Sequence, residues 1–193
     1  KERMIEIWEA EADKTPEKAN DNETLIHDGE TREYVLYVPS IYDGSSDVPL
    51  LFNFHGFGGT ANDRGRAITT DIFGNTYITG SYSGTVDFDP SSSVTNLVSK
   101  GGEDIFVCKL DISGNLVWAK SFGGTGNDLG LTVEVSSSGD VFLGGSYRNT
   151  VDFDPGIGIT NRTSSGGEDS FIIKFDNIGT FQWVNAFGGS SST

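Results

Sequence analysis

The sequence VDFDP at residues 86–90 recurs as VDFDP at residues 151–155, and this recurrence decides the fold. The same offset of 65 positions relates further matching stretches, namely GGED at 101–104 and 166–169, and FGG at 122–124 and 187–189. Laying residues 57–121 over 122–186 without gaps gives about 29 identities in 65 positions. Because self-similarity at a fixed period is typical of repeat architectures, the chain contains a tandem repeat.

Each repeat predicts four short strands, because apolar runs alternate with Gly-Asn and Ser-Gly turn pairs such as Gly74-Asn75. The predicted strands are 66–70, 76–79, 104–110 and 116–122 in the first repeat, and 131–135, 141–144, 169–175 and 181–187 in the second. Four short antiparallel strands in each repeat are typical of a β-propeller blade. A β-solenoid is the alternative, but its repeats are usually shorter.

The phrases SYSGTVDFDP, DIFGNTYITG and GGEDIFVCKLDISGNLVWAKSFGGTGND resemble bacterial propeller-type repeats called SBBP repeats. The resemblance covers residues 57–193. It implies a propeller-like fold and an extracytoplasmic location, either secreted or at the bacterial cell surface. It implies no particular ligand.

The segment before the repeats has a different character. Residues 48–54 form a mostly apolar run that leads into HGFGG at residues 55–59. A buried strand that ends in His-Gly-x-Gly-Gly is typical of the α/β-hydrolase loop that gives a backbone N–H to the oxyanion hole. Residues 25–60 resemble the N-terminal part of secreted esterases of the polyhydroxybutyrate depolymerase and feruloyl esterase type. This resemblance implies that His55, Gly56, Phe57 and Gly58 mark an oxyanion loop.

The remainder of such an esterase is not found. A hydrolase of this class needs a nucleophile elbow of the form G-x-S-x-G, but the stretch GSYSG at residues 80–84 has tyrosine at its centre. The catalytic histidine should follow the nucleophile, and no histidine follows His55 in this sequence. The sequence therefore favours a non-catalytic protein. The alternative is a carboxylic ester hydrolase whose catalytic core is missing here.

Two pairs of aspartates are candidate metal ligands. We expect Asp87 and Asp89 to alternate along a strand, so that both carboxylates face one side, and Asp152 and Asp154 repeat the pattern. Carboxylate oxygens bind Ca²⁺, which makes a calcium-dependent carbohydrate-binding module a further hypothesis. The alternative is that these acids cap local turns before proline. No other cofactor is indicated.

Charge and composition exclude some partners. The formal net charge is -15, with 13 basic residues against 28 acidic ones, so binding to nucleic acid is not expected. The sequence has no run of 18 apolar residues, so no membrane-spanning helix is expected. Cys108 is the only cysteine and corresponds to Ile173 in the second repeat, which predicts a small buried apolar residue.

The predicted fold class is mainly β, with two four-stranded propeller-like blades that follow a truncated α/β-hydrolase-like strand segment. The predicted domains are a helical or linker segment at 1–20, an esterase-like β segment at 21–56, blades at 57–121 and 122–187, and the opening of a truncated third repeat at 188–193. The predicted function is a secreted scaffold that attaches to a surface or binds a protein or polysaccharide. Since propellers close with about 4–8 blades, further repeats or self-association are expected.

Overall fold

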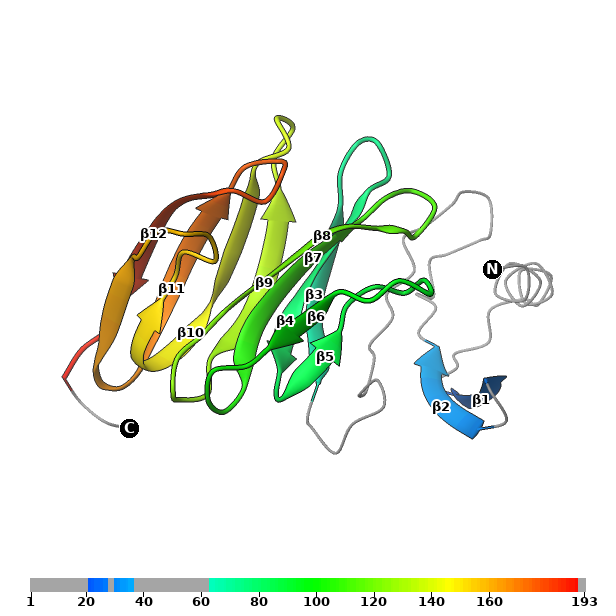
Figure 1. The fold of residues 1–193 in the computed structure, drawn as a ribbon, viewed down its shortest axis with the longest axis horizontal. Coiled ribbons are helices and arrows are strands. Elements are labelled where there is room, and N and C mark those ends of the chain that lie inside the picture. The colour runs from blue at the N-terminus through cyan, green and yellow to red at the C-terminus, as the bar shows by residue number, and fades with distance from the viewer. Residues whose placement is uncertain (1–20, 28–29, 37–62, 191–193) are drawn as a thin grey trace. The chain divides into compact units, whose positions relative to one another are not determined.

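The computed structural model describes residues 21–27, 30–36 and 63–190. The chain divides into two compact units, Lys1–Leu50 and Leu51–Thr193. All the strands pair in antiparallel fashion, and the described residues include no helix (Figure 1). The expected segment 1–20, the apolar run 48–54 and the loop residues His55, Gly56, Phe57 and Gly58 lie outside the described residues.

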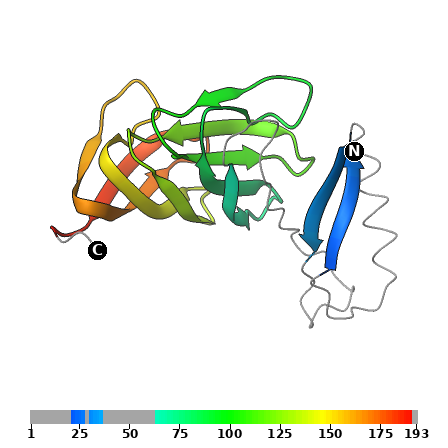
Figure 2. The same cartoon turned by 90° about the horizontal axis from the view of Figure 1, so that it is seen from below.

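The first unit contains one described hairpin (Figure 2). Strand β1 (Asp21–His27) pairs with β2 (Glu30–Leu36), with Asp21 opposite Leu36 and His27 opposite Glu30. The sequence predicts β structure within residues 21–56, but the polarity of residues 21–30 favours turns over a strand there, and that detail is wrong because β1 is a strand. A strand ladder is made by backbone N–H and C=O groups, so polar side chains do not prevent it.

The second unit contains two four-stranded sheets. The strands of the first sheet, in spatial order, are β3 (Arg64–Thr70), β4 (Thr76–Tyr82), β7 (Asp104–Leu110) and β8 (Leu116–Phe122). Those of the second sheet are β9 (Leu129–Val135), β10 (Val141–Asp152), β11 (Asn161–Phe175) and β12 (Phe181–Phe187). Each predicted strand position holds a strand, and the four predicted strands of each repeat form one sheet.

Each repeat contains a further hairpin, of which the sequence predicts only the strand that carries Asp87 in the first repeat and Asp152 in the second. In the first repeat it is a separate two-stranded sheet formed by β5 (Thr85–Asp87) and β6 (Asn96–Val98), with Thr85 opposite Val98. In the second sheet the equivalent pairing sets Thr150 opposite Thr163, within the longer strands β10 and β11. The VDFDP sequence therefore marks the end of a hairpin in both repeats.

The two sheets stack face to face, and β9 lies against β3 and β4 (Figure 1). The core between them contains Tyr77, Val107 and Phe122 of the first sheet, all fully buried, together with buried side chains of the second sheet. The second-sheet members are Val133, Val141, Leu143, Tyr147, Val151, Phe153, Phe171, Ile173, Phe175 and Val184. Most of the apolar burial in this unit is therefore shared between the two repeats, which is how repeat proteins gain stability.

A second, smaller core covers the opposite face of the first sheet. Its buried members are Tyr82, Val86, Phe106 and Cys108. These positions match Tyr147, Val151, Phe171 and Ile173 of the second repeat, which face the first sheet. Each sheet thus has one face that carries the positions of Tyr82 and Phe106 and an opposite face that carries the positions of Val107 and Phe122.

Candidate functional site

The aspartates of the first repeat bind backbone N–H groups. The Asp87 Oδ1 atom accepts hydrogen bonds from the N–H of Asp89 at 3.0 Å and of Thr95 at 2.8 Å. The Asp89 Oδ1 atom accepts one from the N–H of Ser91 at 2.9 Å. Asp87 is the last residue of β5, and Asp89 lies beyond the strand, so the expected alternation of both residues along one strand is wrong.

The second repeat copies these contacts. Asp152 Oδ1 accepts hydrogen bonds from the N–H of Asp154 at 3.2 Å and of Thr160 at 2.8 Å, and Asp154 Oδ1 accepts one from Gly156 at 2.8 Å. Both pairs of carboxylates therefore cap turns. Within the described residues no group of three or more His, Cys, Asp or Glu side chains could hold a metal ion. Calcium binding by these aspartates stays a prediction.

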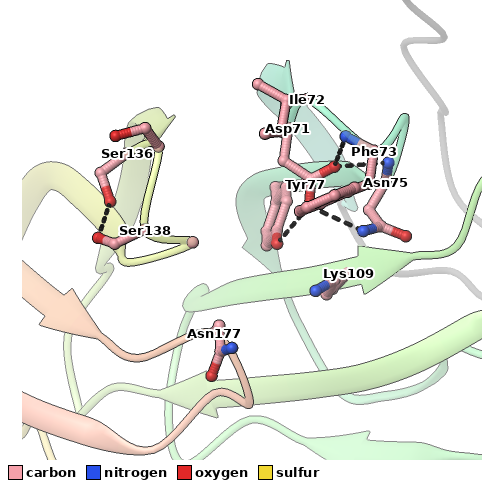
Figure 3. Close-up of a pocket in the computed structure, with 11 residues that line it drawn as sticks. Asp71, Ile72, Phe73, Asn75, Tyr77, Lys109, Ser136, Ser138 and Asn177 are labelled. Carbon is pink, nitrogen blue, oxygen red and sulfur yellow. Dashed lines mark hydrogen bonds between the residues drawn. The ribbon is translucent and has the colours of Figure 1, made fainter.

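A hollow of about 130 Å³ lies between the two sheets (Figure 3). It is lined by the turn at residues 71–75 of the first repeat, the turn at 136–139 of the second, and Asn177. Tyr77 and Lys109 of the first sheet complete the lining. Sequence reasoning missed this hollow because its walls come from both repeats and meet only when the sheets stack.

The charged groups of the hollow are held in a fixed network. The Tyr77 hydroxyl donates to Asp71 Oδ2 at 3.1 Å, and Lys109 Nζ lies 5.1 Å from the centre of the Tyr77 ring. Burial raises the pKa of Asp71, but hydrogen bonds from Asn75, Phe73 and Tyr77 outweigh it and leave that pKa below its ordinary value. Burial raises the pKa of Tyr77. Asp71 is therefore ionised and Tyr77 protonated near neutral pH.

The outer face of the second sheet exposes large apolar side chains. The solvent-exposed fractions are 44% for Ile172, 38% for Trp183 and 56% for Phe187, and Phe142 beside them is half-buried. We call these four residues the open face. Their equivalents 65 positions earlier are Tyr77, Val107, Trp118 and Phe122, and these are covered by the second sheet. An exposed patch of this kind is typical of an interaction surface.

No known protein-family profile matches the chain. The chain is 32% identical over 124 residues to Regulatory protein FlaEY of Caulobacter vibrioides, covering 64% of this chain and 13% of that protein. It is 26% identical over 168 residues to an uncharacterised WD repeat-containing protein of Acanthamoeba polyphaga mimivirus, covering 72% of this chain and 12% of that protein. The chain thus spans only a small part of the length of either relative. No described segment forms a helix long and apolar enough to cross a membrane.

Proposed function

We propose that this chain is a non-catalytic scaffold of the β-propeller type, in which 65-residue repeats stack as blades and present surfaces for protein interaction. The observation that carries the proposal is the face-to-face stacking of two four-stranded sheets related by the repeat. Each sheet is an antiparallel meander, as in a propeller blade, and the first strands of the two sheets, β3 and β9, are neighbours. The similarity to a WD repeat-containing protein supports the same reading.

The location is part of this proposal. The resemblance of residues 57–193 to SBBP repeats supports a scaffold that acts outside the cytoplasm. The acidic composition, with a formal net charge of -15, would keep such a scaffold soluble and would disfavour anionic surfaces as partners.

The stacking is tested by unfolding the chain in urea while following far-UV circular dichroism and tryptophan fluorescence. We expect the unfolding transition seen by circular dichroism to coincide with the one seen by fluorescence. The two sheets of Leu51–Thr193 share one core, so they should unfold together. Phe122→Ala should lower the midpoint by about 1–2 M, given the typical cost of removing a buried phenylalanine. Phe73→Ala, at a side chain that is 72% exposed, is the control and should change little. Separate unfolding of the two sheets would contradict the scaffold.

The absence of catalysis is tested with p-nitrophenyl acetate and butyrate. We expect the chain and its His55→Ala variant to give the same background turnover, because the sequence has no nucleophile elbow and no later histidine. Turnover that is well above background and falls in the variant would instead support the ester hydrolase.

A further inference from the structure

We propose that the open face of the second sheet is a docking site for a further sheet of the same 65-residue repeat. This inference rests on the stacked scaffold proposed above and names the partner of its exposed surface. The partner is identified by the internal repeat, because the structure already shows what covers the equivalent face of the first sheet.

Phe122 is the central contact of the interface that exists. Its ring centre lies 5.6 Å from that of Phe153 and 6.0 Å from that of Phe171. It stands at the end of β8 and is completely buried. Phe187 stands at the equivalent end of β12, on the same face of its own sheet, and more than half of it is exposed. Phe187 is therefore equivalent to Phe122, but among the described residues no aromatic side chains of a neighbouring sheet pack against it.

The aromatic residues that contact Phe122 come from a single repeat, and each repeat has an equivalent set. In the second sheet Tyr147, Phe153 and Phe171 form an aromatic trio, with ring centres 5.2 Å apart for Tyr147 and Phe153 and 5.0 Å apart for Phe153 and Phe171. The first sheet has the same trio in Tyr82, Phe88 and Phe106, with the corresponding distances of 5.3 and 4.9 Å. A further copy of the repeat would carry its own trio, ready to receive Phe187.

The backbone after Phe187 begins along the path that already joins the two sheets. Gly123 abuts the carboxylate of Asp104, and Gly188 abuts the carboxylate of Asp169 in the same way. Gly101 is likewise close to the backbone of Thr125, and Gly166 to that of Ser190. Residues 188–190 therefore repeat the local contacts that residues 123–125 make at the start of the loop between the two sheets.

A second copy of the chain fits this face less well. The trio that its first sheet could offer is already covered, since Tyr82 is 0% and Phe106 only 7% exposed. The trio of its second sheet is occupied by Phe122. Neither trio can receive Phe187 without opening a packed core, whereas a further repeat would fold its own trio around Phe187 as the second repeat packs its trio around Phe122.

The experiment compares the chain with an extended chain in which residues 188–193 are replaced by a copy of residues 123–187, which keeps the 65-residue phase. Hydroxyl-radical footprinting with mass spectrometry reports the accessibility of Ile172, Trp183 and Phe187. We expect their oxidation to slow several-fold in the extended chain. In the same comparison Phe187→Ala should lower the urea midpoint by about 1–2 M in the extended chain, as Phe122→Ala does in the original, and hardly at all in the original chain.

Phe73→Ala serves as the control in both chains. Unchanged oxidation of the open face, or a Phe187→Ala effect equally small in both chains, would overturn the docking proposal. Protection of Phe187 already in the original chain, together with a dimer in sedimentation velocity, would assign the face to a second copy and also overturn it. If Phe122→Ala has no effect in the original chain, the stacked scaffold itself fails, so the two failures are distinguishable.

Discussion

The Oδ1 atom of Asp128 accepts a hydrogen bond from the backbone N–H of Arg148 at 2.9 Å, which ties the loop between the two sheets to β10. The Oδ2 atom of Asp128 accepts a second one from the N–H of Gly124 at 2.8 Å. The backbone N–H of Asp128 in turn donates to the carbonyl oxygen of Glu103 at 2.7 Å. One buried residue therefore links the first sheet, the connecting loop and the second sheet.

Asp128→Ala should destabilise the chain by about 3 kcal/mol, because it removes two hydrogen bonds to a carboxylate and leaves their donors unpaired in a largely buried site. The matched control is Asp63→Ala at the equivalent position of the first repeat. Asp63 accepts a single described hydrogen bond, from the N–H of Ser83 at 3.3 Å, so we expect a loss of about 1 kcal/mol. Urea unfolding measures both. Equal losses in the two variants would count against the linking role of Asp128.

Asp104 should make the chain more stable as the pH falls from 7 to 5. Burial raises the pKa of this carboxyl to about 6, the N–H of Lys100 opposes the rise, and the nearby Asp128 carboxylate adds to it. Because the folded pKa lies above the unfolded one, the folded state binds more protons between about pH 4 and 6, and stability falls as the pH rises through that window. The contribution amounts to about 1 kcal/mol between pH 7 and 5.

The measurement is the unfolding free energy of the chain and of Asp104→Asn at pH 7 and pH 5. The variant should lose that part of the pH dependence. Asp89→Asn is the control: hydrogen bonds from Ser91 lower the pKa of Asp89, so its contribution is lost only below about pH 4, outside the window. A pH dependence that is identical in the chain and in Asp104→Asn would refute the assignment to Asp104.

Most strands could be predicted from the sequence, because apolar runs and turn pairs alternate in the same order within each repeat. Pairs such as Gly74-Asn75 mark the turns, and Gly74 indeed adopts a positive φ of 79°. A strand that carries Asp87 was expected, but β6 and its pairing with β5 were missed, since strands of three residues carry too little periodicity to read. β1 was missed because its residues are mostly polar and only its backbone pairing defines it.

The candidate surfaces were harder to predict than the strands. The sequence singled out the aspartates as candidate site residues. Their hydrogen bonds could not be predicted, because they involve backbone N–H groups up to eight positions away, as for Asp87 and Thr95. The hollow needs turns from two repeats to meet. The open face could have been found by repeat equivalence, since Phe122 and Phe187 occupy the same position, but which face of a sheet is covered follows only from the stacking direction.

Gly145→Ala should destabilise the chain by about 3 kcal/mol through overpacking. A Cβ atom at Gly145 would collide with the carbonyl oxygen of Leu129 on the neighbouring strand β9, where the pairing register shifts between Gly144 and Gly145. Backbone atoms cannot move aside as a flexible side chain can, so the strands must separate locally.

Gly114→Ala is the control for this substitution. Gly114 has a positive φ of 77° but no atom within 4 Å of an added Cβ, so the cost is limited to backbone conformation, about 1 kcal/mol. Thermal or urea unfolding compares the two variants. A smaller loss in Gly145→Ala than in Gly114→Ala would show that β9 and β10 are not so closely apposed.

Cys108 should resist thiol reagents in the folded chain. Its side chain lies in the core formed with Tyr82 and Phe106, and burial raises its pKa to about 12. The reactive thiolate is therefore scarce as well as inaccessible, and we expect labelling by Ellman's reagent at pH 8 to be on the order of 1,000-fold slower than in urea. Because Cys108 is the only cysteine, the rate reports on opening of this one core, and Cys108→Ser sets the background. Labelling of the folded chain as fast as in urea would mean that the outer face of the first sheet is open in solution.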